Sequence, residues 1–215
     1  APSDINLRIE AIADTKSFLS RRPYTVNRAG LERIKTDAKR LEKFTTSNSE
    51  LSFAQMAALA YPDRIGMRRK GSEPRYVLSG GKGAVLDQSD TLAGERFLVA
   101  TDLDGNPREA KIRQAIPISI GEIRSLFERN IHWINHCEWS KRDRRVIARQ
   151  QERLGSIVLD DRIWKDASDS AILKAMLDGV RDLGITLTPA AKRFVARVML
   201  GGQDFPDVSL PTLLD

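Results

Sequence analysis

The chain has 215 residues, enough for one sizeable core or for two or three small subdomains. Hydrophobic residues make up 41% and charged residues 30%, a balance that excludes a disordered chain, and no apolar run approaches the roughly 20 residues that span a bilayer. The net charge of +6 favours an acidic partner, with nucleic acid before an anionic membrane.

Residues 1–62 are predicted to form a helical segment. A helix that begins near Asn27 is indicated by apolar residues at steps of three and four, which line one face: Leu31, Ile34, Ala38, Leu41 and Phe44. An earlier helix is expected to carry these residues on its inner side: Ile5, Ile9, Ile12 and Leu19. The polar run 45–50 separates the second helix from a third, which we expect to end at Tyr61 before Pro62.

Residues 63–160 are predicted to form a small OB-like β-barrel with one internal helix, because the apolar period changes to two. The first strand candidates are residues 75–79, 96–101 and 110–118, with "DLDGNP" as a turn between the last two. On the third of these strands the isoleucines expected to point inward are Ile112, Ile116 and Ile118.

The predicted internal helix starts at a capping box formed by Ser119 and Glu122 and runs through Phe127. Residues 131–139, 144–150 and 156–159 supply further strand candidates, which we assign to the same barrel.

Residues 161–215 are predicted to be helical, and we expect this region to be incomplete at its end. One helix would carry an apolar stripe of Ile172, Leu173, Met176, Leu177 and Val180. Another would begin at Thr188 with Pro189, end at Gly201-Gly202 and turn Phe194, Val195 and Val198 inward. The predicted fold class is therefore α+β: a helical N-terminal segment, an OB-like barrel and a helical C-terminal segment.

Catalytic and metal motifs fail on their chemistry. The "SGGKGAV" loop lacks the hydroxyl that follows the lysine in a phosphate-binding loop, and "DLDGNP" has proline where a calcium loop needs glycine. Two histidines on one strand, His132 and His136, would lie about 13 Å apart, too far for one zinc ion. We expect no catalytic residue, metal or cofactor here. The single cysteine, Cys137, excludes an intramolecular disulfide and favours a cytoplasmic location.

Basic residues gather in two stretches that flank predicted strands and suit contacts with nucleic-acid phosphates. The candidate residues are Arg64, Arg68, Arg69, Lys82, Arg144, Arg145, Arg149 and Arg153. The second stretch begins beside Trp139, which we interpret as a core residue rather than a base-stacking one. Period-two alternation would place Arg145 and Arg149 on one face and Arg144 on the other. A solvated basic face stays open as the alternative.

The order and wording of several segments resemble the C-terminal half of HrpB-type bacterial helicases, in the DEAH-box group of superfamily 2. These segments are "AYPDRI", "RYVLSGGKGAVL", "LAGERFLVATDLDG", "AKIRQAIPI" and "VIARQQERLGSIVL". The likeness is strong from about Ser49 to Leu159 and looser through "FPDVSL". Lys82 stands where the family usually has an arginine.

The resemblance implies an ATP-driven helicase with two RecA-like motor domains, a winged helix, a helical ratchet region, an OB-like barrel and a further C-terminal region. This chain carries no Walker A or D-E-x-H motif, so we expect a non-catalytic accessory region, with ATP and Mg²⁺ bound by the motor domains. The implied partners are single-stranded nucleic acid, RNA before DNA, and the motor domains, with no membrane. The alternative is a protein-interaction or regulatory platform without nucleic-acid binding.

Overall fold

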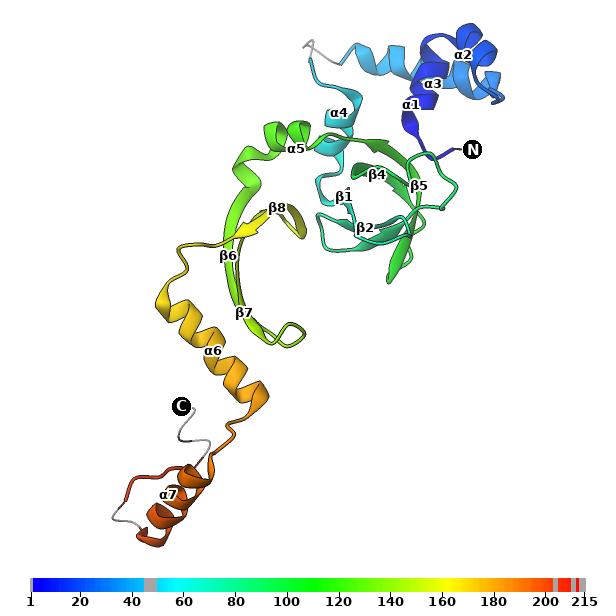
Figure 1. Ribbon diagram of the computed structural model, residues 1–215. Coiled ribbons are helices and arrows are strands. Elements are labelled where there is room, and N and C mark those ends of the chain that lie inside the picture. The colour runs from blue at the N-terminus through cyan, green and yellow to red at the C-terminus, as the bar shows by residue number, and fades with distance from the viewer. Residues whose placement is uncertain (1, 45–49, 203–204, 210–211, 213–215) are drawn as a thin grey trace. The chain divides into compact units, whose positions relative to one another are not determined.

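The computed structural model describes residues 2–44, 50–202, 205–209 and 212. The chain divides into two compact units, one of residues 1–132 with 153–159 and the other of residues 133–152 with 160–215 (Figure 1). The domain boundaries after residues 62 and 160 stay predictions. No helix in the described ranges has both the length and the apolar character needed to cross a bilayer.

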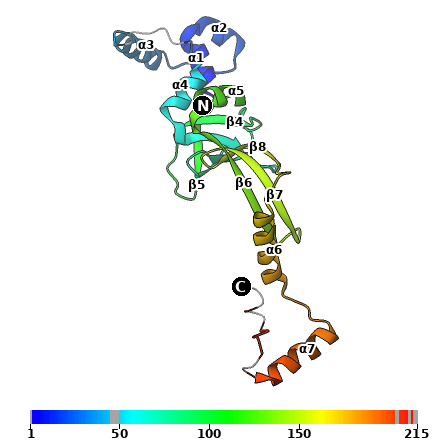
Figure 2. The same cartoon turned by 90° about the vertical axis from the view of Figure 1, so that its left-hand side faces the viewer.

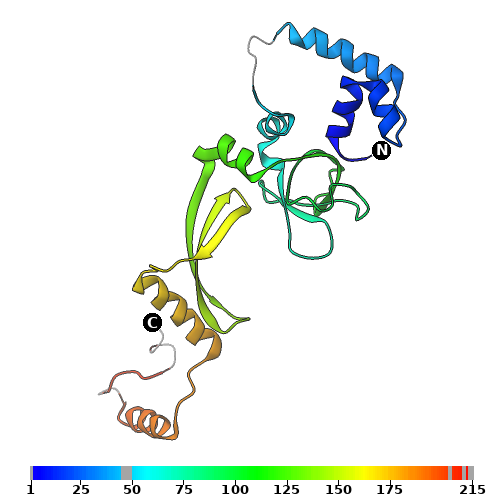
Figure 3. The same cartoon turned by 45° about the horizontal axis from the view of Figure 1, so that its top comes forward.

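The first unit opens with a cluster of three helices, α1 (Ile5–Ala13), α2 (Thr15–Arg21) and α3 (Arg28–Glu42), seen most clearly in Figure 3. Asn27 caps α3 by accepting a hydrogen bond from the Gly30 amide, as the sequence predicts. The apolar stripe of α3 is only partly buried, however. Leu31 is buried, whereas Ile34, Ala38 and Leu41 are exposed and Phe44, just beyond the helix, is 79% exposed.

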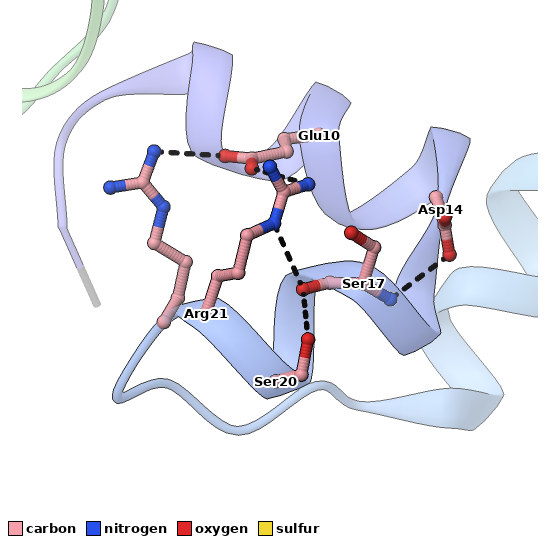
Figure 4. Close-up of polar contacts among 6 residues, drawn as sticks. Glu10, Asp14, Ser17, Ser20 and Arg21 are labelled. Atoms are coloured by element: carbon pink, nitrogen blue, oxygen red, sulfur yellow. Dashed lines mark hydrogen bonds and ion pairs between the residues drawn. The ribbon is translucent and has the colours of Figure 1, made fainter.

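Asp14 divides the single helix predicted before residue 20 into two. Its side chain accepts a hydrogen bond from the Ser17 amide at 3.0 Å and so caps α2 (Figure 4). Its own amide donates to the Glu10 carbonyl and closes the last turn of α1. Glu10 then joins the two helices through ion pairs to Arg21 at 3.5 Å and Arg22 at 3.2 Å. A polar side chain that can cap thus outweighs the continuity of the apolar pattern.

A closed barrel of five strands follows, in the order β1-β2-β3-β5-β4. Its strands are β1 (Ile65–Arg68), β2 (Arg75–Leu78), β3 (Gly83–Val85), β4 (Phe97–Leu103) and β5 (Glu109–Pro117). Every pairing is antiparallel except β3 with β5, which is parallel. The OB-like barrel predicted from the sequence is confirmed, although β1 and β3 were not among its strand candidates.

Two apolar layers hold this unit together. The barrel interior is filled by Tyr76, Leu78, Leu98 and Ile112 with several alanines between them. A second layer lies outside the barrel, where Ile65, Phe97, Val99 and Ile116 pack against helices α4 (Phe53–Ala60) and α5 (Ile120–Phe127). Short 3-10 turns, η1 (Pro62–Arg64) and η2 (Glu128–Asn130), follow the two helices.

The sequence predicts that all three isoleucines at β5 point into the barrel, and this is correct for one of them and wrong for two. Ile112 points into the barrel, but Ile116 and Ile118 lie in the outer layer. The cause is an irregular register between β4 and β5 around Ala100 and Asp102, where a bulge shifts the alternation by one residue. All three isoleucines are buried even so.

Glu122 ties the starts of α4 and α5 together. Ser52 and Ser119 each form a capping box, and Glu122 accepts hydrogen bonds from both hydroxyls, at 2.5 Å and 2.8 Å. The bond from Ser52, followed by those from Ser119, holds the pKa of Glu122 below its usual range. The capping box predicted at Ser119 is confirmed, and it also fixes a neighbouring helix.

The remaining strands form a separate sheet of three, ordered β6-β7-β8, rather than part of the barrel. They are β6 (Ile131–Ser140), β7 (Arg145–Leu154) and β8 (Ile157–Ile163), and the long β6–β7 hairpin is clear in Figure 2. Assigning them to the barrel was wrong, because five strands already close it and leave no free edge to extend.

The second unit continues with α6 (Asp169–Leu183) and α7 (Pro189–Leu200). Thr188 caps α7 and Gly201 ends it, as predicted. The predicted inner faces are partly wrong: α6 buries Ala175 and Gly179 rather than Leu173 and Met176, and α7 buries Val198 while Phe194 stays exposed.

Replacing Ile116 by Asp is expected to unfold the first unit, because the carboxylate would be buried without a partner in the outer layer at a cost of several kcal/mol. Arg113→Asp, on an exposed position of the same strand, is the matched control and should change stability little. Thermal unfolding followed by circular dichroism compares them, and equal melting temperatures for both variants would contradict the packing described.

Tyr76→Phe is expected to lower the free energy of unfolding by about 1 kcal/mol. The Tyr76 hydroxyl is buried and donates to the carbonyls of Leu92 and Glu95, each at 3.0 Å, and burial raises its pKa to about 12. Because the folded state favours the neutral phenol, its stabilisation is complete below the ordinary pKa of 10.0 and is lost as pH rises toward about 12. Urea unfolding between pH 9 and 12 measures this loss, which the Phe variant should lack; parallel curves for the two proteins would contradict it.

Candidate nucleic-acid interface

Two of the predicted barrel residues, Arg64 and Lys82, come together. Arg64 ends η1, its guanidinium lies 4.9 Å from the centre of the Tyr61 ring, and its Nη1 donates to the Thr101 carbonyl at 3.3 Å. Lys82 sits in the tight β2–β3 turn, where its carbonyl accepts from the Leu78 amide. Both line a hollow of about 500 Å³ at the end of the barrel.

Carboxylates share this hollow with the two cations. Asp63 and Asp102 also line it. Nearby, amide hydrogen bonds from Asn106 and Lys111 hold the pKa of Asp104 below its usual range, with a smaller effect from Lys82. These acids weaken the local positive potential. The hollow therefore offers a phosphate two donors in a nearly balanced field rather than a strongly basic pocket.

Arg68 and Arg69 are adjacent in sequence but have different roles. The Arg68 guanidinium donates to the carbonyls of Ala93 at 2.9 Å and Ser72 at 3.4 Å, so it holds two loops against β1. Arg69 is exposed in the loop between β1 and β2, and its side chain has no partner within the described ranges. Arg68 is therefore a structural residue, whereas Arg69 is free to meet a ligand.

Two arginines of strand β7, Arg149 and Arg153, are partly covered by the protein itself. Arg149 is held by Asp161, with Nε 2.8 Å from Oδ1 and Nη2 3.3 Å from the carbonyl, and this hydrogen bonding raises the pKa of Arg149. Arg153 is half-buried, and its Nε finds no hydrogen-bond partner in the part of the chain that the structure describes. Arg149 is thus engaged by a carboxylate, and Arg153 is only partly accessible.

Arg144 and Arg145 lie at the end of the β6–β7 hairpin. Arg144 is in the turn with a φ of 51°, so the prediction that it alternates with Arg145 along a strand was wrong. Both are exposed, and Arg142 in the same turn is 95% exposed. Residues 141–145 hold four basic side chains and one acidic one. We call this turn the basic tip.

Trp139 has a structural role, although it is half-buried rather than part of a buried core. It packs on Gly179 of α6, where an added Cβ would lie 2.6 Å from the indole. Its Nε1 donates to Asp182 at 3.2 Å, and Lys141 binds the same carboxylate at 2.8 Å. The bond from Lys141, then that from Trp139, lowers the pKa of Asp182. These contacts dock α6 on the sheet.

Sequence reasoning missed a second tryptophan, Trp133, which is 45% exposed on β6 with the Arg162 guanidinium 4.1 Å from its ring centre. Trp133 and Trp139 lie on the same strand, an even number of residues apart, so strand alternation places them on the same face. The local sequence therefore does not indicate which of the two is covered by another element. Within the described residues, no group of three or more His, Cys, Asp or Glu side chains could hold a metal ion.

Gly179→Ala is expected to destabilise the docking of α6 by about 1–3 kcal/mol, because the new methyl group overlaps the Trp139 indole. Limited proteolysis within residues 164–184 and the tryptophan emission spectrum would report the release of the helix. Lys174→Ala, on an exposed position of the same helix, is the control. Unchanged cleavage of the Gly179 variant would show that this contact does not hold α6.

Comparisons with known proteins point to one family. The model of the connector region of the ATP-dependent RNA helicase HrpB matches residues 131–162, which are the strands of the three-stranded sheet. Over 168 residues the chain is 27% identical to the ATP-dependent RNA helicase HrpB of Escherichia coli (strain K12), a match that covers 75% of this chain and 20% of that protein.

Solved structures agree. The crystal structure of the E. coli DExH-box NTPase HrpB matches with a TM-score of 0.54 and 26% identity over 99% of this chain and 26% of that one. The crystal structure of the Escherichia coli DEAH/RHA helicase HrpB matches with a TM-score of 0.53 over 100% of this chain and 26% of that one, and at 24% identity it supports the fold alone. The chain spans about a fifth to a quarter of the length of these relatives. The resemblance to the C-terminal part of HrpB-type helicases is confirmed.

Proposed function

We propose that this chain, similar to the C-terminal part of HrpB-type helicases, serves as a non-catalytic accessory region of an ATP-dependent RNA helicase. In this role it contacts single-stranded nucleic acid, RNA before DNA, and supports motor domains that bind ATP and Mg²⁺ elsewhere in the protein. A cytoplasmic location accords with this role.

The observation that carries the nucleic-acid contact is the basic tip. Arg142, Arg144 and Arg145 project from the turn of a long hairpin, and exposed guanidinium groups match the geometry of phosphate oxygens. The tip also lies within the segment matched by the HrpB connector model.

The barrel adds a second group of contacts. Arg64 and Lys82 line one hollow, and Arg69 lies in the β1–β2 loop, which together with strands 2 and 3 is a usual ligand-binding region of OB-like barrels. Arg68, Arg149 and Arg153 are left out of the proposed contact set, because Arg68 and Arg149 each make two hydrogen bonds to protein acceptors and Arg153 is half-buried. Arg64 stays in the set, since it makes one such bond and lines the hollow.

We expect weak binding of single-stranded RNA, dominated by phosphates. If three or four phosphates are neutralised, the slope of log affinity against log salt should be about −2 to −3, at about 0.7 per contact. Arg144→Glu/Arg145→Glu should reduce the steepness by about 1.4 and weaken binding at low salt. Fluorescence anisotropy with a labelled oligouridylate across a salt series measures both quantities.

The matched control is Lys174→Glu/Lys192→Glu, which changes the net charge equally at exposed positions of α6 and α7. A loss confined to the tip variant supports a located contact. An equal loss in both variants would indicate nonspecific attraction to net charge, and no binding by the unmodified chain would overturn the nucleic-acid role.

The alternative role, a protein-interaction platform, is favoured by one observation. Exposed apolar side chains follow one side of α6, namely Leu173, Met176 and Leu183, the first 60% exposed. If the unmodified chain binds no nucleic acid, this surface becomes the better-supported contact for the motor domains or another partner.

A further inference from the structure

A row of side chains, half-buried at Gln150 and otherwise exposed, crosses all three strands of the β6–β8 sheet. It consists of Trp133 and Asn135 on β6, Gln150 on β7 and Arg162 on β8. The Asn135 Oδ1 accepts from the Gln150 Nε2 at 3.0 Å, and the Gln150 Oε1 accepts from the Arg162 Nε at 3.1 Å. These contacts place the four side chains on one face.

The hydrogen bonds fix the Arg162 guanidinium over the indole. Its central carbon lies 4.1 Å from the Trp133 ring centre, inside the range of a cation–π contact. A long arginine side chain ordinarily loses rotamer freedom when it binds a ligand. Here the free protein already holds Arg162 in place, so a ligand would meet a preorganised aromatic and cationic surface.

This surface differs in chemistry from the basic tip. The arginines of the tip offer charge and hydrogen-bond donors to phosphates, whereas an exposed indole beside a planar guanidinium also offers a π surface to a base. Trp133 is 45% exposed, so part of its indole is accessible to a ligand. The Asn135 amide nitrogen and the outer guanidinium nitrogens add donors at the rim.

We propose that Trp133 and Arg162 form a stacking platform for an unpaired base of single-stranded nucleic acid, and this rests on the nucleic-acid contact proposed above. The positive charge of Arg162 and the phosphate-binding tip on the same hairpin complement a polyanion. The base stacks on the indole–guanidinium pair, and Arg162 also neutralises part of the adjoining phosphate charge.

The test separates base contacts from phosphate contacts. Affinity is measured by fluorescence anisotropy for a labelled 12-nucleotide oligouridylate and for an abasic ribose-phosphate chain of the same length, using the whole 215-residue chain. The unmodified chain should bind the base-bearing strand more tightly, by roughly 5- to 150-fold for one stacked base.

Trp133→Ala should remove this preference and leave the affinity for the abasic strand unchanged, while Trp133→Phe should keep part of it. Arg162→Lys keeps the charge but loses the planar group, so the preference should shrink with little change in the salt slope. Ile134→Ala is the matched control, because Ile134 is also 45% exposed on the same strand but alternates to the other face. Circular dichroism of each variant verifies the fold.

Each outcome decides between the proposals. Loss of the base preference in Trp133→Ala but not in Ile134→Ala supports the platform. Equal binding of both strands by the unmodified chain, or a preference that survives Trp133→Ala, overturns the platform and leaves the phosphate contacts standing. Failure to bind either strand overturns both.

Discussion

Closure of the five-stranded barrel is the constraint on which the first unit depends. The parallel pairing of β3 with β5 and the pairing of β1 with β4 use every strand edge, and so small a cylinder leaves little room inside. Gly66 meets this limit, since a Cβ there would lie 3.1 Å from Leu98 and 3.2 Å from Leu78. Tyr76 then fills the interior and anchors the loop at Leu92 and Glu95 through its hydroxyl. A second set of apolar residues, among them Phe97 and Ile116, packs outside the barrel under α4 and α5, and the β2–β3 turn carries Lys82 to the hollow lined by Arg64.

Local chemistry predicted the fold more reliably than periodicity did. The caps at Asn27, Ser119 and Thr188 depend only on a side chain and the amides two or three residues beyond it, and each lies where the sequence indicates. Periodicity reports which residues share a face, but not whether another element covers that face. The stripe of α3 shows the difference, because Leu31 is buried while Ile34 is exposed on the same helix. Barrel closure and the bulge near Ala100 depend on pairings between strands that are distant in sequence. The alternation of residues along a single strand contains no information about these pairings.

The candidate site shows the same limit for charges. Arg68 and Arg149 are as basic as Arg69 and Arg145, and composition ranks them equally. Their roles differ because the fold brings acceptors to two of them, the Ala93 carbonyl to Arg68 and the Asp161 carboxylate to Arg149. Such bonds stabilise the sheet and the loops, and breaking them to reach a phosphate would cost the original partner its donor. The number of arginines in a stretch of sequence therefore sets only the maximum number that the folded protein can offer to nucleic acid.

The two tryptophans of β6 show how one docked helix defines a functional surface. Trp139 and Trp133 alternate to the same face, yet α6 packs on the first through Gly179 and Asp182 and leaves the second exposed. A residue larger than glycine at 179 would hold the helix away from the indole, so the smallest side chain on α6 determines how closely it approaches. The part of the sheet around Trp133 is not covered by α6. There the side chains of Asn135, Gln150 and Arg162 are held in place by hydrogen bonds to one another, and the indole stays accessible to solvent. Strand β6 thus carries both a half-buried tryptophan that anchors a helix and an exposed tryptophan that a ligand can reach, and the position of α6 decides which of the two is covered.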